Sequence, residues 1–178
     1  EVELHDWYEL YPEKFNNKTN GITQRRWLLS SNPELAKFIT DRIGHGWEKD
    51  LTLLKGLEKF SSDKDLNELI SIKENNKRRL AEYLKYAQNE TIDPESIFDV
   101  QVKRLHEYKR QLMNILHIMY VYNKMLEDPT YKPAKKTYIF GAKSASGYRR
   151  AKAIIKLITT VAERINNDRR VNDRLHVV

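Results

Sequence analysis

The chain has 178 residues, of which 40% are hydrophobic and 32% are charged. This balance is typical of a globular protein with its own core and excludes a disordered chain. No apolar run approaches the ~20 residues that a membrane-spanning helix needs, and the acidic start Glu1-Val2-Glu3 does not resemble a signal peptide. Cysteine is absent, which excludes disulfides and thiolate chemistry and favours a reducing, cytoplasmic compartment.

The net charge of +7 is distributed unevenly along the chain. Residues 1–100 carry 15 basic and 19 acidic side chains, whereas residues 101–178 carry 17 basic and 6 acidic ones. The second part therefore has a net charge of +11 and the first a net charge of −4. A local excess of this kind predicts either one phosphate-rich site or a nucleic-acid-binding face.

The first half of the chain divides into two predicted segments. Residues 1–31 show no regular periodicity and are predicted to form an extended lead-in. Residues 32–92 are predicted to be mostly helical, because apolar residues recur at helical spacing. Asn32 suits an N-cap and Pro33 the first helical position, while Gly44 suits the end of that helix.

Residues 93–178 show a different pattern, in which short β-like runs alternate with amphipathic helices. The strands are predicted at 98–102, 136–140 and 175–178, and the helices at 112–126 and 151–165. This βαβαβ order predicts an α/β fold, a partial Rossmann-like parallel sheet with flanking helices, preceded by the helical segment. The chain stops inside the third apolar strand, so we expect the region to be truncated at its C-terminus.

The most informative loop is residues 103–110, between the first predicted strand and its helix. Ligands of open parallel sheets bind at the carboxyl ends of the strands, where the following helix adds positive potential. This loop places four cations within eight residues at the start of a helix, where positive charge is unfavourable. An anionic ligand such as phosphate would resolve that conflict. A solvated basic rim would have the same composition.

A second loop, residues 141–147, follows the next predicted strand. Its glycines and small residues would let the backbone approach a ligand closely. The pattern is neither a Walker A loop nor a dinucleotide-binding fingerprint, so an ordinary strand-to-helix turn is the favoured interpretation. We expect Tyr148, which follows the loop, to pack against its own helix rather than to stack on a ligand.

Other kinds of site find little support in the sequence. The five histidines are scattered without the spacing of metal ligands, and we predict no metal site. His117 lies in an apolar helical pattern and is predicted to be a core histidine. No base lies near Ser144 or Ser146, and no pair of carboxylates suits glycoside hydrolysis.

Three motifs resemble those of the glycogen/α-glucan phosphorylases. Residues 99–112 (DVQVKRLHEYKRQL) closely resemble a signature of this family. Residues 18–28 (KTNGITQRRWL) match a second motif, in which the family usually has proline where Gln24 stands. Residues 140–148 (FGAKSASGY) are a looser form of a third. The three motifs occur in order, at fitting intervals, over nearly the whole chain.

The resemblance implies a cytoplasmic enzyme of the two-domain glycosyltransferase-B architecture. Members of the family cleave terminal α-1,4-linked glucose from glycogen or maltodextrin with orthophosphate, which gives glucose 1-phosphate. Their cofactor is pyridoxal phosphate, whose 5′-phosphate exchanges a proton with the substrate phosphate. The resemblance also implies that the whole enzyme is a homodimer, and that its partners are glucan and orthophosphate rather than nucleic acid or membrane.

Matching positions carry the family's site residues over to this chain. Arg104 would bind the substrate phosphate, and Lys109 would lie between the substrate and cofactor phosphates. Lys103 would support the cofactor phosphate, with Trp27 near the cofactor. Tyr108 and Asn20 would form hydrogen bonds to the glucosyl unit. Arg104 and Lys109 are thus the predicted catalytic residues.

One segment of the family pattern has no counterpart here. The family's cofactor lysine lies in a Gly-Thr-Gly-Asn-Met-Lys segment that this sequence lacks. We therefore expect the chain to be an inactive fragment of the start and first part of the C-terminal domain, without bound cofactor. Two alternatives stay open: a nucleotide-sugar glycosyltransferase of the same architecture, and a basic nucleic-acid-binding module, which needs cations spread along a face with stacking aromatics.

Overall fold

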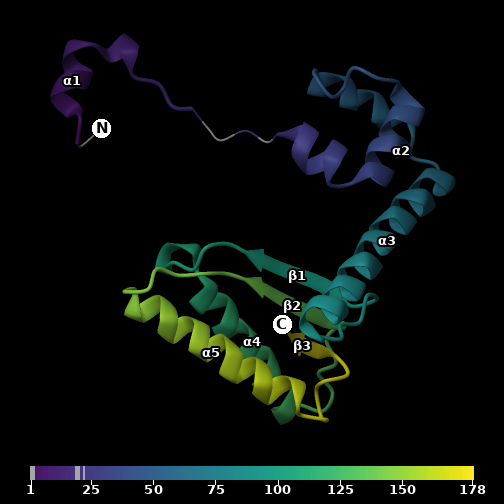
Figure 1. Ribbon diagram of the computed structural model, residues 1–178, viewed down its shortest axis with the longest axis vertical. Coiled ribbons are helices and arrows are strands. Elements are labelled where there is room, and N and C mark those ends of the chain that lie inside the picture. Colours follow the sequence, from purple (N-terminus) through teal and green to yellow (C-terminus); the bar gives the residue numbers. More distant parts are fainter. Residues whose placement is uncertain (1–2, 19–20, 22) are drawn as a thin grey trace. The chain divides into compact units, whose positions relative to one another are not determined.

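The computed structural model describes residues 3–18, 21 and 23–178, which form two compact units that divide between Ile72 and Lys73 (Figure 1). The predicted boundary at 92/93 therefore falls inside the second unit. In the part of the chain that the structure describes, no helix is long and apolar enough to cross a membrane.

The first unit is helical. Its elements are α1 (His5–Leu10), the 3-10 turn η1 (Pro12–Lys14), the π-helix η2 (Arg25–Ser30), α2 (Pro33–Ile43), the 3-10 helix η3 (Leu51–Lys59) and the first part of α3 (Asp63–Gln88). The segment 1–31, which we predicted to be extended, thus contains three short helices. None of the three contains a fully buried residue, and with 6, 3 and 6 residues each is too short to show a helical periodicity in the sequence.

Helix α2 begins and ends as predicted. The Asn32 side chain accepts a hydrogen bond from the Leu35 backbone N–H at 3.3 Å, and Pro33 occupies the first turn. Gly44 ends the helix with a φ of 78°, a conformation that favours glycine. The core of this unit forms around the fully buried Trp47, whose indole N–H donates to the Thr40 hydroxyl at 3.1 Å.

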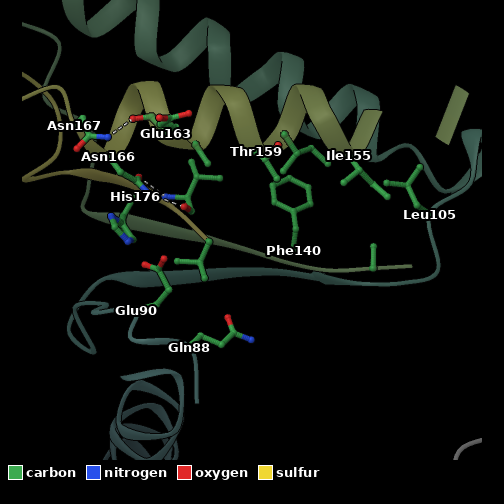
Figure 2. Close-up of a pocket in the computed structure, with 15 residues that line it drawn as sticks. Gln88, Glu90, Leu105, Phe140, Ile155, Thr159, Glu163, Asn166, Asn167 and His176 are labelled. Carbon is green, nitrogen blue, oxygen red and sulfur yellow. Dashed lines mark hydrogen bonds between the residues drawn. The ribbon is translucent and has the colours of Figure 1, made fainter. Parts of the chain in front are cut away.

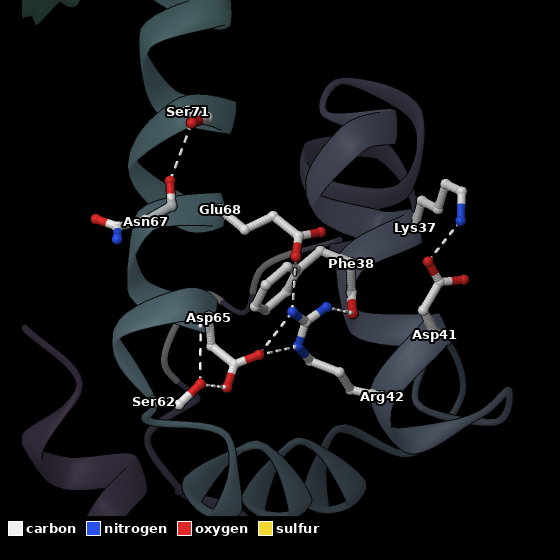
Figure 3. A network of polar contacts seen from close by, with 9 residues as sticks. All are labelled: Lys37, Phe38, Asp41, Arg42, Ser62, Asp65, Asn67, Glu68 and Ser71. Atoms are coloured by element: carbon white, nitrogen blue, oxygen red, sulfur yellow. Dashed lines mark hydrogen bonds and ion pairs between the residues drawn. The ribbon is translucent and has the colours of Figure 1, made fainter.

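Arg42 links α2 to the start of α3 (Figure 3). Its guanidinium donates to Asp65 Oδ1 at 2.7 and 3.0 Å and to Glu68 Oε2 at 2.8 Å. It also donates to the Phe38 carbonyl at 3.3 Å and lies 3.4 Å from the centroid of the Phe38 ring. Ser62 donates to Asp65 and so completes the network. The side chain of Arg42 is 12% exposed and fully partnered.

The second unit contains a parallel sheet of three strands in the order β1-β2-β3. Its elements are β1 (Ile97–Val102), the 3-10 turn η4 (Glu107–Lys109), α4 (Gln111–Glu127), β2 (Lys136–Gly141), α5 (Arg149–Asn166) and β3 (Leu175–Val177). The predicted α/β fold, a partial Rossmann-like sheet with flanking helices, is confirmed. In register, Val102 at the end of β1 lies opposite Gly141 at the end of β2.

The two faces of the sheet are covered by different helices. Helices α4 and α5 pack together with Tyr138, Leu175 and Val177 in one core cluster (Figure 1). The alternate residue Ile139 packs instead with Leu84 of α3, as expected from the period of two along a strand. The second half of α3 therefore belongs to the sheet unit, which explains why the boundary falls within this helix.

His117 is exposed, so our prediction of a core histidine was wrong. Helix α4 buries Ile115, Ile118 and Tyr122 against the core, and position 117 falls on another side. Its apolar neighbour Leu116 is 50% exposed as well. An apolar pattern on most sides of a helix does not show which side is covered.

Candidate functional site

The two loops that we singled out adjoin each other at the carboxyl ends of β1 and β2. The backbone N–H of Leu105 donates to the Lys143 carbonyl at 3.0 Å, which joins loop 103–110 to loop 141–147. Gly141 has a packing reason for being glycine, because a Cβ there would lie 3.1 Å from Val102 Cγ2. The packing of β1 against β2 is thus one reason for a glycine at the start of the second loop.

The backbone of loop 103–110, which we call the basic loop, has a defined conformation. Leu105 is 1% exposed and anchors the loop in the core, while the turn η4 carries it toward α4. Arg110, the N-cap of α4, adopts a left-handed conformation with φ 63° and ψ 27°. Such a conformation disfavours any residue with a Cβ other than asparagine or aspartate, and strain of this kind often marks functional sites.

The cations of the basic loop have no acidic partners. Among the residues that the structure describes, Lys103, Arg104, Lys109 and Arg110 form no ion pair. Lys103 and Arg104 are exposed, Lys109 is half-buried, and the Lys109 ammonium lies 5.2 Å from the Tyr108 ring centroid. All of these residues precede the N-terminus of α4, whose dipole adds positive potential. The arrangement can bind anions.

Three amide side chains hold the backbone of the basic loop through hydrogen bonds. Gln111 Nε2 donates to the carbonyls of Lys103 and Arg104 at 3.2 and 3.3 Å. Gln101 Nε2 donates to the Lys109 carbonyl at 2.9 Å. Asn114 Nδ2 in turn donates to Gln101 Oε1 at 3.0 Å. The backbone of the loop is therefore held at both of its ends.

Glu107 connects the basic loop to the start of α5. It accepts hydrogen bonds from the Tyr148 hydroxyl at 2.8 Å and from Arg150 Nη1 at 2.5 Å. These bonds, the one from Arg150 first, hold the pKa of the Glu107 carboxyl below its usual value. Tyr148 packs against the core cluster of this unit, and its hydroxyl accepts from the Glu107 backbone N–H at 3.4 Å, a contact between the two loops. Our expectation that it packs against its own helix stays a prediction. The ring of His106 lies between those of Tyr108 and Tyr148, at centroid distances of 4.4 and 5.3 Å.

Sequence reasoning missed these supporting residues, namely Gln101, Gln111, Asn114, Glu107 and Arg150. The sequence carries only a weak indication of these residues. Gln111 opens an apolar helix and is 1% exposed, although glutamine is mostly found on surfaces. A polar residue at a position that the helical pattern predicts to be buried could have marked it.

The other predicted site residues lie in the first unit or outside the described chain. Trp27 belongs to η2 and its side chain is 67% exposed. Asn20 lies outside the described residues. The roles of both remain predictions. Among the residues that the structure describes, no cluster of three histidine, aspartate or glutamate side chains could hold a metal ion.

A hollow of about 570 Å³ lies between α5 and the sheet (Figure 2). It is lined mainly by apolar side chains and by His176. Burial lowers the pKa of the His176 imidazole. The hollow reaches Leu105 and Ala142 but none of the predicted phosphate-binding residues. We therefore place the candidate site at the basic loop and not in this hollow.

Comparison with known proteins agrees with these features. The family model of the carbohydrate phosphorylases matches residues 1–178. Glycogen phosphorylase of Synechocystis is 48% identical over 179 residues, and the alignment covers 100% of this chain and 21% of that protein. The liver form of human glycogen phosphorylase is 49% identical, and its alignment covers 97% of this chain and 20% of that protein. Glycogen phosphorylase of Bacillus subtilis is 48% identical, and its alignment covers 100% of this chain and 22% of that protein.

The chain thus spans about a fifth of the length of these relatives. The match of the family model to every residue shows that the chain belongs to the carbohydrate phosphorylase family.

Proposed function

We propose that this chain forms the phosphate-binding part of an α-1,4-glucan phosphorylase, which releases glucose 1-phosphate from glycogen or maltodextrin with orthophosphate. The observation that carries the proposal is the basic loop at the carboxyl end of β1, where four cations have no carboxylate partner among the residues that the structure describes. The named relatives, which are glycogen phosphorylases, support the choice of substrate class.

The residues of the basic loop fit a second phosphate group, that of pyridoxal phosphate, because one short loop holds several cations without an ion-pair partner in the described chain. Lys103 and Lys109 would hold the cofactor phosphate, and Arg104 would hold the orthophosphate with its planar guanidinium. When bound, the cofactor would contribute its 5′-phosphate as an acid–base group beside the substrate phosphate, and Lys103 and Lys109 would hold it there. The proposal includes the homodimer that the family resemblance implies.

The chemical task of the loop is to keep two phosphates close together. Two unit charges of the same sign at 4 Å repel each other by about 4 kcal/mol at an effective dielectric constant of 20. A lysine between the two groups offsets this repulsion, and Lys109 takes that role in the proposal. Tyr108, whose side chain is 69% exposed, is available to a sugar next to the phosphate.

The test uses the full-length protein that carries this chain. We expect Arg104→Ala to lose ~10–150-fold in phosphate binding, the effect of one charge-assisted hydrogen bond, and more in turnover. The absorbance of bound pyridoxal should be unchanged in Arg104→Ala and reduced in Lys109→Ala. The exposed Lys156→Ala on α5 is the matched control, with activity unchanged. Near-normal phosphorolysis in Arg104→Ala would refute the proposal.

A further inference from the structure

We infer that Gln101 and Gln111 are positioning residues, which set the phosphate-binding geometry of the basic loop through its backbone carbonyls. The inference rests on the proposed function, because it assigns these two amides to the same site. Neither amide is proposed to touch phosphate. Each acts through the backbone of a residue whose cation does.

The contacts of Gln111 bracket one residue. Its Nε2 atom donates to the Lys103 carbonyl at 3.2 Å and to the Arg104 carbonyl at 3.3 Å. These carbonyls belong to the two peptide planes on either side of the Arg104 Cα atom. One amide therefore fixes the direction in which the Arg104 side chain leaves the backbone.

The contact of Gln101 lies at the other end of the loop. Its Nε2 atom donates to the Lys109 carbonyl at 2.9 Å, and Asn114 orients the amide by donating to its Oε1 at 3.0 Å. The peptide plane that follows Lys109 leads into Arg110, which has a φ of 63°. A left-handed arginine persists only where its surroundings hold it. The bond from Gln101 supplies such a constraint next to Lys109.

The burial of Gln111 argues against a role in packing alone. The residue is 1% exposed, and its Oε1 atom is buried without a hydrogen-bond partner among the described residues. A methionine would fill a similar volume and would leave no unpaired side-chain oxygen in the core. The amide is explained by the two bonds that it donates, and both bonds lie at the basic loop.

In the described parts of the chain, no ion pair fixes Lys103, Arg104 or Lys109. Ordering a long basic side chain on a ligand costs entropy, and the cost falls when its backbone already has the required direction. The amides should therefore affect phosphate binding more than glucan binding.

The test compares Gln111→Met and Gln101→Met with the parent sequence in the full-length, cofactor-loaded protein. We expect each variant to raise KM for orthophosphate about tenfold and to leave KM for glucan within twofold. The matched control is Asn166→Leu. The Asn166 side-chain amide also makes two hydrogen bonds to backbone: its Nδ2 donates to the Val177 carbonyl at 2.8 Å, and its Oδ1 accepts from the Val177 N–H at 3.0 Å. These bonds lie at the C-terminal end of α5, whereas the basic loop lies near its N-terminal end. It should lower thermal stability without changing KM for orthophosphate.

A double variant separates the possible outcomes. If Gln111 acts through Arg104, adding Gln111→Met to Arg104→Ala should raise KM for orthophosphate by less than twofold more. The inference would be overturned if the effects of Gln111→Met and Arg104→Ala on KM for orthophosphate were fully additive. It would also be overturned if Gln111→Met and Asn166→Leu changed that KM equally. If Gln111→Met does not fold, the KM values of Gln101→Met for orthophosphate and for glucan decide, each compared with those of Asn166→Leu; an unchanged KM for orthophosphate in Gln101→Met would then overturn the inference. A normal KM in Arg104→Ala itself would instead overturn the proposed function.

Discussion

Arg42 in the first unit and Arg104 in the second show two opposite uses of the same side chain. Arg42 is almost buried and bonds to Asp65, Glu68 and the Phe38 carbonyl. Arg104 is exposed and has no acidic partner among the described residues. The comparison indicates that an arginine used to stabilise the fold is surrounded by acceptors, whereas one reserved for a ligand is left without them.

The largest expected effect concerns stability. Replacing Arg42 leaves two carboxylates close together without their cation, whereas replacing Arg104 leaves nothing unpaired. We expect Arg42→Met to lower the Tm of the 178-residue chain by about 10 °C, and Arg104→Met to change it by less than about 2 °C. Thermal unfolding followed by circular dichroism measures both. Equal losses in the two variants would remove the distinction.

The second effect sharpens the role of the unpaired cations. Phosphate at ten times its Kd should stabilise the folded chain by about 1.4 kcal/mol, which corresponds to a rise in Tm of roughly 5 °C. In the double variant Arg104→Met, Lys109→Met, phosphate should raise the Tm only through its non-specific effect, which arises because phosphate is excluded from protein surfaces. Thermal scans with phosphate and with chloride at matched ionic strength test this. An equal rise in both proteins contradicts specific binding.

The third effect uses pH. Hydrogen bonds from Ser62, and then from Arg42, lower the pKa of Asp65, so the folded state favours its ionised form. Its contribution to stability is complete above its unfolded pKa of about 3.9 and is lost as the pH falls through the folded pKa. Asp65→Asn should therefore lower the Tm by about 3 °C at pH 7. The difference from the parent sequence should shrink below pH 4, as thermal scans at pH 7 and pH 3 would reveal.

The smallest effect concerns the left-handed residue of the basic loop. Arg110→Gly relieves an unfavourable φ of 63° but gives the unfolded chain more freedom. We expect a net rise in Tm of about 2 °C together with a smaller phosphate-induced shift, because one cation is lost. The same thermal scans measure both quantities. A fall in Tm would show that the Arg110 side chain stabilises the loop in a way that its contacts do not explain.

Much of the second unit could be predicted from periodicity. The three strands and two helices of residues 97–177 lie where alternating and helical patterns placed them. The short helices before Asn32 could not be predicted, because none spans more than 6 residues and none contains a fully buried residue. The division between the two compact units within α3 could not be read from the sequence, because the sequence does not show which surface the apolar side of a helix covers.

The candidate site was predictable only in part. The cations of the basic loop are close together in the sequence. Their position at the start of a helix, where the helix dipole disfavours positive charge, indicated an anion-binding site. Their supports do not stand together: Glu107 meets Tyr148 and Arg150 across 41 and 43 positions. Contacts of this kind follow from the crossover between strands and not from local pattern.

Glu107, which α5 holds through Arg150, also determines the electrical balance of the site. It is the sole carboxylate in residues 103–110, and its partner Arg150 comes from outside that segment. The negative charge of Glu107 is thus compensated from elsewhere, and the segment keeps four uncompensated positive charges. Two phosphate groups carry between them about −3 to −4 at pH 7. Two phosphates would therefore nearly neutralise the four cations, and a basic loop that holds both would have little remaining attraction for a third anion.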